Sequence, residues 1–401
     1  MIITGKQGRL TWKNDNHFPD YVNGRNKDDL LLRPSTQPKQ MNKRLYSAAA
    51  IMCAIASLSS CKKDDDSGPA VKPYTVPTTY SFPNYDFTKS NQLARMTVEI
   101  DAYLKTANTG SAVVALNQAK LNNMFSNTGN AFSDASLNTS GINVTDFTSD
   151  AAIYKAYADS VLIYNNGATA AAGTGGFVAR GTNKIIVGPR GLEYGQAYVK
   201  GVMGGLFFKE AVKKLTSVKS MSVTDTVNAQ AAWDAAFGYL AVPVNYDTSI
   251  TYASTDPIRP LLWGGYLAER GKAIQAGGTI FQAFLKGRAA IGGYDVTIRN
   301  AQADIILAKW EQLCAAAALN YVIAPTASSA IGNYGTQLHA LSEGFGFIVS
   351  LKYRPANSKL SAADFDTLKT IINKDFYTLL NQPGFTDLVT AQNILKTAYG
   401  L

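Results

Sequence analysis

Helical periodicity runs through most of this 401-residue chain. From Thr88 onward, apolar side chains recur at spacings of three and four residues, which is the period of an amphipathic helix. Leu93, Met96, Ile100 and Leu104 show it in the first such segment. Comparable patterns cover residues 91–106, 111–126, 148–164, 191–215, 225–241, 264–291, 296–323, 336–352, 361–381 and 386–399. A chain patterned in this way buries its apolar faces by packing helix on helix.

The fold that we predict is therefore all-α, a multi-helix bundle of about ten helices with one short β-hairpin. The hairpin would pair residues 177–180 with 184–187 through the turn Gly181-Thr182-Asn183. The pair Gly277-Gly278 would split or bend the helix that contains it. The helices would form either a single domain over residues 88–401 or two packed bundles.

The N-terminal part of the chain is unlike the rest. Residues 1–40 are polar, mixed in charge and without apolar period. We expect them to be a disordered upstream extension, with a genuine N-terminal arm as the alternative. Residues 41–60 are typical of a signal peptide, because Lys43 and Arg44 precede an apolar run at 48–58 that is too short to span a bilayer.

A cysteine closes this signal-like segment. The run Leu58-Ser59-Ser60-Cys61 resembles the bacterial lipobox, whose cysteine is lipidated; a chance cysteine after an ordinary signal is the alternative. The charged run 62–68 resembles the acidic tract that sends Bacteroidota lipoproteins to the cell surface; an ordinary solvated tether is the alternative. We therefore expect a lipid on Cys61 and an outer membrane lipoprotein exposed at the cell surface, anchored without spanning the membrane. Residues 61–87, rich in proline, would form an extended tether whose last aromatic side chains dock on the helices.

Charge and composition exclude several classes of function. The formal net charge is +9, but residues 1–61 hold nine basic and four acidic residues, so the remainder carries +4. No basic stripe with interleaved aromatic residues follows, which excludes nucleic-acid binding. His17, Cys53 and Cys61 also lie in residues 1–61. The rest of the sequence therefore has one histidine, His339, and one cysteine, Cys314. A disulfide framework and a multi-histidine zinc site are therefore excluded.

The main candidate site lies on a helix that is apolar on nearly every side. Between residues 337 and 351, the ionisable side chains are His339 and Glu343, which are four positions apart and share one face. Small residues on that face would let a ligand or another backbone approach: Gly335, Ser342 and Gly346. We interpret the pair as a polar pocket for a metal ion or small ligand, completed by a carboxylate from another helix. The alternative is a structural hydrogen bond that fixes helix register.

Two further segments supply candidate pocket residues. Asp234 lies beside an apolar stripe that contains Trp233 and Phe237. It would cap a helix, pair with a basic side chain or face the His339 pocket. The segment 193–205 offers three more candidates, although its glycine spacing indicates close helix packing: Glu193, Gln196 and Lys200. The chain has no P-loop lysine motif and no Gly-x-Ser-x-Gly elbow.

From about Tyr74 to Leu401, the chain resembles an uncharacterised family of Bacteroidota surface lipoproteins. The resemblance is carried by residues 80–82, 193–205, 233–239, 339–344 and 398–401. More distantly, the chain is similar to imelysin-type envelope proteins, which are all-α double bundles linked to iron uptake and once proposed to be metallopeptidases. Their signature is Gly-x-His-x-x-Glu. His339 matches its histidine, whereas Gln337 replaces the glycine and the acid follows one position late, at Glu343.

These features predict a surface-anchored lipoprotein that binds a small ligand or an envelope partner and is not an enzyme. The resemblance implies a role in iron or haem acquisition, with a metal ion, iron or haem as ligand or cofactor and with His339 and Glu343 as metal ligands. One alternative is a metal-dependent hydrolase of imelysin type that uses His339, Glu343 and Asp234. The other is a glycan-binding lipoprotein with exposed Trp and Tyr side chains.

Overall fold

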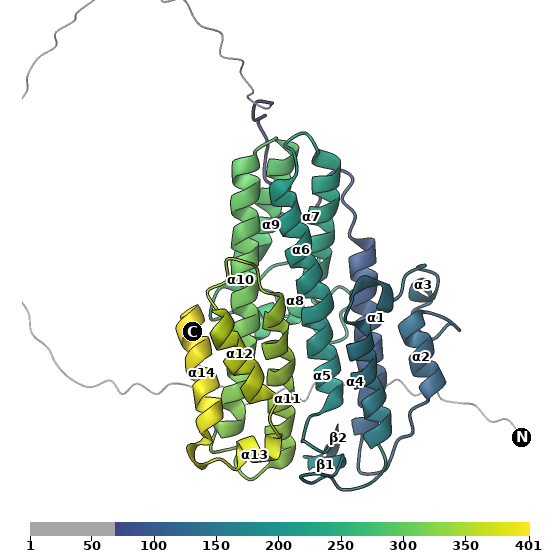
Figure 1. Cartoon of the computed structure of the whole chain (residues 1–401). Coiled ribbons are helices and arrows are strands. Elements are labelled where there is room, and N and C mark those ends of the chain that lie inside the picture. Colours follow the sequence, from purple (N-terminus) through teal and green to yellow (C-terminus); the bar gives the residue numbers. More distant parts are fainter. Residues whose placement is uncertain (1–68) are drawn as a thin grey trace, which may run out of the picture. The chain divides into compact units, whose positions relative to one another are not determined.

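The computed structural model describes residues 69–401, and helices predominate in them (Figure 1). This confirms the expected all-α bundle with one short hairpin. The upstream extension, the signal-like segment and Cys61 lie outside the described residues. The elements are α1 (Thr88–Lys105), α2 (Gln118–Ser126), α3 (Ala135–Asn138), α4 (Ala151–Tyr164), β1 (Gly176–Arg180), β2 (Asn183–Val187), α5 (Tyr194–Val202), α6 (Lys209–Ser220), α7 (Thr226–Leu240), α8 (Trp263–Glu269), α9 (Ala276–Gly292), α10 (Val296–Ile323), α11 (Tyr334–Ser350), α12 (Ala362–Ile372), α13 (Phe376–Leu380) and α14 (Thr386–Tyr399).

Two long helical rods organise the bundle (Figure 1). In one, α5 continues through a π-helical turn, Met203–Phe208, into α6. The other is α10, whose 28 residues correspond to a length of about 42 Å. α10 packs against α9, α11, α6 and α14, while α5 packs against α4, α11 and α1. Because the surrounding helices share these rods, the described residues belong to one compact unit.

The π-helical turn widens the first rod where neighbouring side chains press against it. At Gly205, a Cβ would overlap the hydroxyl of Tyr154, so the glycine permits this close approach. The carbonyl groups of the turn find donors outside the rod: Thr148 Oγ1 donates to the Gly205 carbonyl at 2.6 Å, and Trp263 Nε1 donates to the Met203 carbonyl at 2.7 Å. The glycine spacing in this segment therefore serves close packing, as predicted.

One predicted interruption lies at the wrong position. The break between α8 and α9 falls at residues 270–275, before Gly277 and Gly278, which are both inside α9. A Cβ at Gly277 would crowd the side chain of Tyr246. This glycine therefore allows a loop to pack against α9 and does not bend the helix.

Residues 69–87, which we call the strap, have no helix or strand of their own but pack on the bundle. Tyr80 is wholly buried, and its ring stacks on Phe237 with 3.7 Å between the ring centroids. The expected docking of the aromatic side chains is thus observed. The compact unit includes the whole strap, so it begins well before residue 88, where we placed the end of the tether. The boundary was misplaced because extended chain carries no helical periodicity to mark it.

The hairpin lies beside the beginning of α11, where Gly335 abuts the carbonyl of Ala179. β1 and β2 pair antiparallel as predicted, with Asn183 in the strand and not in the turn. Lys184 on β2 is buried, and its ammonium donates to three main-chain carbonyls of the loop after α1. These belong to Thr109, Gly110 and Ala112, at 3.3, 3.2 and 2.5 Å. Lys184 therefore joins the hairpin to that loop.

We expect Lys184→Met to lower the free energy of unfolding by about 1–3 kcal/mol, because three carbonyls lose their donor while the alkyl stem remains. Urea unfolding at pH 7, followed by circular dichroism, measures this change. Lys369→Met is the control, since its side chain is 51% exposed and pairs only with Asp366 within α12; it should change stability by less than about 0.5 kcal/mol. Equal effects of the two substitutions would contradict the role of Lys184.

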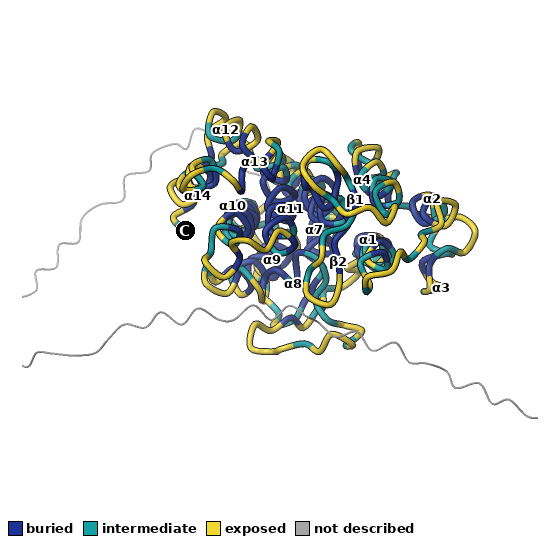
Figure 2. The backbone as a smooth tube through the Cα atoms, turned by 90° about the horizontal axis from the view of Figure 1, so that it is seen from below, coloured by how far each residue is buried: buried dark blue, intermediate teal, exposed yellow. Residues whose placement is uncertain are grey.

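Large aromatic side chains and a thiol contribute to the core. Trp263 and Trp310 are at most 1% exposed, and Cys314 is fully enclosed. In Figure 2 the buried residues occupy the middle of the bundle and the exposed residues its rim. Between residues 69 and 401, no helix combines the length and the apolar character needed to cross a membrane.

Candidate functional site

Two facing helices carry the predicted site residues. Glu193 stands immediately before α5, and Gln196 and Lys200 follow at spacings of three and four, on the same face. α11 packs against α5 and carries His339 and Glu343 one turn apart. The structure brings Glu193, Lys200, His339 and Glu343 together; we call these four side chains the ionic cluster.

His339 is held between two carboxylates. Its Nδ1 lies 2.7 Å from Glu193 Oε2, and its Nε2 lies 3.8 Å from Glu343 Oε1. Because an ionised carboxylate only accepts hydrogen bonds, we assign the proton to Nδ1, which donates to Glu193. The Glu193 side chain is 2% exposed and that of His339 is 14% exposed. Solvent therefore reaches this pair at the imidazole.

Lys200 neutralises Glu343 in the interior. Its Nζ lies 3.3 Å from Glu343 Oε1, and the two side chains are 11% and 9% exposed. Burial by itself raises the pKa of the Glu343 carboxyl, but the charge of Lys200, the strongest opposing influence, outweighs it, and the pKa is about 2. Burial likewise opposes the charge of Lys200, yet Glu343 raises the pKa of this ammonium above its usual value. Both side chains are therefore charged at neutral pH.

Asn108 and Ser342 fix the position of Glu193. Asn108 Nδ2 donates to Glu193 Oε1 at 3.3 Å. The Glu193 main-chain N–H donates to Ser342 Oγ at 2.8 Å, and that hydroxyl donates to the Leu338 carbonyl at 2.6 Å. The sequence identified Ser342 only as a small neighbour. It gave no signal for Asn108, which lies 85 positions before Glu193 in a short 3₁₀ turn, Thr106–Asn108.

Two tyrosines extend the ionic cluster towards α8 and α10. The hydroxyls of Tyr266 and Tyr321 lie 3.1 Å apart, and the Lys200 ammonium lies 5.0 Å from the centroid of the Tyr266 ring. Burial, reinforced by the neighbouring carboxylates, raises the pKa of both phenols well above the usual value. They therefore remain neutral hydrogen-bond donors. Neither tyrosine was among the predicted site residues.

Gln196 has a buried amide oxygen without a partner. Its side chain lies between Glu193 and Lys200 along α5, the residue is 4% exposed, and its Oε1 accepts no hydrogen bond from the described residues. Asp101 Oδ1, on the adjacent α1, is buried and unpartnered as well. The charge of Asp101 helps to raise the pKa of Lys200, so these acceptors lie near the ionic cluster. Buried acceptors of this kind are normally satisfied by water or a ligand donor.

Asp234 does not join the ionic cluster, which corrects its assignment to the His339 pocket. Arg288 binds it with two hydrogen bonds, from Nε to Oδ1 at 2.7 Å and from Nη2 to Oδ2 at 3.3 Å. Tyr80 donates to Oδ1 at 2.6 Å. The reason is that α7 packs on α9 and α1, which turns Asp234 towards Arg288. Of the alternatives for Asp234, pairing with a basic side chain is the one observed.

The residues present do not fit a resident metal ion at His339 and Glu343. Within residues 69–401, no group of three or more His, Cys, Asp or Glu side chains is placed to hold one. Glu343 is already paired with Lys200, and Glu193 accepts from Nδ1 of His339. A protein zinc site uses three or four such ligands. His339 and Glu343 therefore do not form a resident metal site by themselves.

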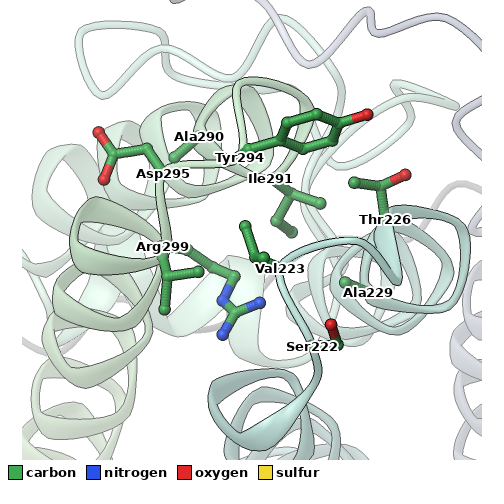
Figure 3. A pocket seen from close by; sticks show the side chains of 10 residues that line it. Ser222, Val223, Thr226, Ala229, Ala290, Ile291, Tyr294, Asp295 and Arg299 are labelled. Atoms are coloured by element: carbon green, nitrogen blue, oxygen red, sulfur yellow. The ribbon is translucent and has the colours of Figure 1, made fainter. Parts of the chain in front are cut away.

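The pocket in Figure 3 lies away from the ionic cluster, between the α6–α7 turn and the α9–α10 turn. It is too narrow to admit a water molecule. Arg299, on its wall, donates to the main-chain carbonyls of Lys219 and Met221, each at 3.2 Å. This guanidinium therefore caps the end of α6. The pocket offers no ligand site.

Exposed tryptophans, which would favour the glycan-binding alternative, are absent from residues 69–401. Trp233, Trp263 and Trp310 are all buried. The half-buried Tyr164 and Tyr194 stack on each other, with ring centroids 5.6 Å apart. One face of each ring is therefore covered by the other ring and is not available to a glycan.

The fold and the ionic cluster define an all-α protein with a charged centre between two packed helices. Residues 77–398 match the family described as a domain of unknown function, DUF4856. The match covers most of the chain, and the protein belongs to this family. The matched region begins inside the strap and ends in α14, so the strap around Tyr80 is part of it. No curated protein and no solved structure matches the chain.

Proposed function

We propose that this chain is a lipid-anchored binding protein at the outer surface of the outer membrane. The support comes from the sequence: a signal-like segment, a lipobox-like run that ends at Cys61, and the acidic tract after it. The resemblance to Bacteroidota surface lipoproteins supports the same setting. The helical bundle is then the ligand-binding part, held at the membrane by its lipid.

The ligand that we propose is an iron-bearing small molecule, either haem or a ferric chelate. One observation carries this proposal: His339 Nδ1 lies 2.7 Å from Glu193 Oε2, which assigns the ring proton to Nδ1 and leaves Nε2 free. The nearest carboxylate to Nε2, on Glu343, lies 3.8 Å away, beyond hydrogen-bond distance. Imidazoles that bind metals typically donate their other ring N–H to a carboxylate in this way. A ligand that brings most of its own iron donors needs only one imidazole, whereas a resident ion needs several.

The partly exposed imidazole would bind the iron, while Glu193, fixed by Asn108 and Ser342, would orient the ring. The resemblance to imelysin-type proteins, which are linked to iron uptake, supports this assignment. The ionic cluster gives no support to the hydrolase alternative, because Glu343 is paired with Lys200 and is held fully ionised at neutral pH. A carboxylate in that state lacks the proton of a general acid and is a weak base.

The test is a titration of the purified chain with haemin, followed by the Soret band. We expect saturable binding that His339→Ala weakens at least about tenfold, which corresponds to about 1.4 kcal/mol. Glu193→Gln should weaken binding less, because the amide oxygen can still accept from Nδ1 although the negative charge is lost. Thr336→Ala, on the same helix and also only partly buried, is the matched control and should bind like the wild type.

Ferric chelates, measured by isothermal titration calorimetry, form the second arm of this experiment. If neither haemin nor a ferric chelate binds the wild-type chain, the iron proposal fails. If His339→Ala binds as well as the wild type while remaining folded, the assignment of the site to His339 fails.

A further inference from the structure

The strap first meets the bundle at the end formed by the α6–α7 and α9–α10 turns (Figure 1). The Lys72 main-chain N–H donates to the Gly293 carbonyl at 2.9 Å, and the Tyr74 hydroxyl donates to Asp295 Oδ2 at 3.0 Å. The Lys72 ammonium also lies 4.2 Å from the centroid of the Tyr294 ring. We call this the strap end of the bundle. These contacts fix where the chain that comes from Cys61 is attached to the folded unit.

Covalent geometry limits how far the strap end can lie from Cys61. Eleven residue steps separate Cys61 from Lys72, and a fully extended chain of that length reaches at most about 40 Å. This limit holds for any arrangement of the intervening residues. A lipid on Cys61 therefore keeps the strap end within reach of the membrane surface.

Both ends of the bundle expose aliphatic side chains, among them Ile163 near the hairpin and three residues at the strap end. Val227, in the first turn of α7, is 76% exposed; Val71, next to Lys72 in the strap, is 58% exposed; and Ile298, in the first turn of α10, is 36% exposed. Exposed aliphatic groups beside a tyrosine and a lysine suit the headgroup region of a bilayer, where apolar side chains insert and amphipathic ones keep their polar ends in water.

The ionic cluster belongs to the opposite end of the bundle. α10 starts at the strap end with Val296 and runs about 42 Å to its last residue, Ile323. Gln337, in the first turns of α11, donates to the carbonyl of Pro325 at 2.8 Å, just beyond the end of α10. His339 follows two residues later, and the hairpin lies at the same end.

We propose that the strap end is a membrane-docking surface, which lies against lipid headgroups and directs the His339 end away from the bilayer. This inference rests on the proposed lipid anchor at Cys61. It gives the anchor a second role, because the strap then sets the orientation of the bundle as well as its location. A ligand that arrives from outside the cell would meet the His339 end first.

The test is energy transfer from the protein to acceptor-labelled lipid. The chain, lipidated at Cys61 and reconstituted in phosphatidylcholine–phosphatidylethanolamine vesicles, carries a donor fluorophore at Thr224→Cys or Thr182→Cys. Both positions are exposed turn threonines, the first at the strap end and the second in the hairpin. Cys314 is fully buried and does not compete for the label. We expect the transfer efficiency at position 224 to be at least twice that at position 182; equal or reversed efficiencies would overturn the docking surface.

Two substitutions test the apolar contact itself. Val227→Glu places a charge at the strap end, so the efficiencies at positions 224 and 182 should converge. Ile163→Glu is the matched control, because Ile163 is 65% exposed at the end of α4 near the hairpin; it should leave the difference intact. If Val227→Glu leaves the difference intact as well, the exposed aliphatic side chains do not contact lipid and the proposal fails.

Mass spectrometry of the membrane-extracted chain separates this inference from the proposed anchor. Absence of lipid on Cys61 overturns the anchor. The orientation is then decided by a chain that carries a hexahistidine tag in place of residues 1–61, bound to nickel-chelating lipid. With that chain, greater transfer at position 224 supports the docking surface, and equal transfer overturns it.

Discussion

Asp234→Ala should lower the free energy of unfolding by about 3–5 kcal/mol, because it leaves a charged guanidinium buried without its partner. Arg288 and Asp234 have side chains that are 3% and 2% exposed and share two hydrogen bonds. The same substitution removes the acceptor of the Tyr80 hydroxyl, which holds the strap to α7. Guanidinium chloride unfolding at pH 7, monitored by tryptophan fluorescence, measures the loss.

Matched variants separate the ion pair from the strap contact. Tyr80→Phe keeps the ring on Phe237 and loses one hydrogen bond to a charged group, so it should cost about 1.5–3 kcal/mol. The double variant Asp234→Leu/Arg288→Met removes both charges together, and it should be more stable than Asp234→Ala alone. If Asp234→Ala lies within about 1 kcal/mol of the wild type, then Arg288 finds another partner or water, and the pair does not hold this region together.

Most of the helical framework could be predicted from the sequence, because a helix that buries one face repeats its apolar residues every three or four positions. α10 and α11 follow that rule, and the hairpin shows itself by residues of high strand propensity on both sides of a glycine turn. The strap could not be recognised as folded. Its burial depends on Tyr80 finding Asp234 and Phe237, which follow it by more than 150 positions and leave no local pattern.

Most residues of the candidate site could be predicted from the sequence, but which side chains pair between helices could not. The spacing of His339 and Glu343 placed them on one face, and the absence of other charges on α11 indicated that they needed partners. Glu193 became the partner because the hairpin delivers it to the start of α5, opposite Ser342. Asp234 was misassigned for the same reason, since its partner Arg288 lies on α9 and spacing within α7 says nothing about the neighbouring helix.

Glu343→Gln should lower the free energy of unfolding at pH 7 by about 3–5 kcal/mol, because it leaves the buried Lys200 ammonium without its carboxylate.

The wild type should also lose stability in acid. The pKa of Glu343 is about 2 in the folded protein and near 4.3 in an unfolded chain. The ionised carboxylate therefore makes its full contribution to the free energy of unfolding above about pH 5. About 3 kcal/mol of this free energy is lost as the pH falls from 5 towards 2. Urea unfolding at closely spaced pH values measures the slope.

The decisive comparison is how steeply the free energy of unfolding falls between pH 5 and 2 in the wild type, Glu343→Gln and Lys200→Met; we call this the acid slope. Glu343→Gln cannot titrate at this position, so its stability should fall less than that of the wild type between pH 5 and 2. Lys200→Met removes the charge that chiefly lowers the pKa of Glu343 against burial, so the carboxyl should protonate at a higher pH and the loss should begin earlier. The same ion pair also affects stability in alkali. The pKa of Lys200 is raised in the folded protein, so its charge stabilises the fold at neutral pH. This contribution is lost only as the pH rises above the usual pKa of lysine. An unchanged acid slope in both variants would show that other carboxylates dominate acid unfolding and that the buried pair is not fully ionised in the folded protein.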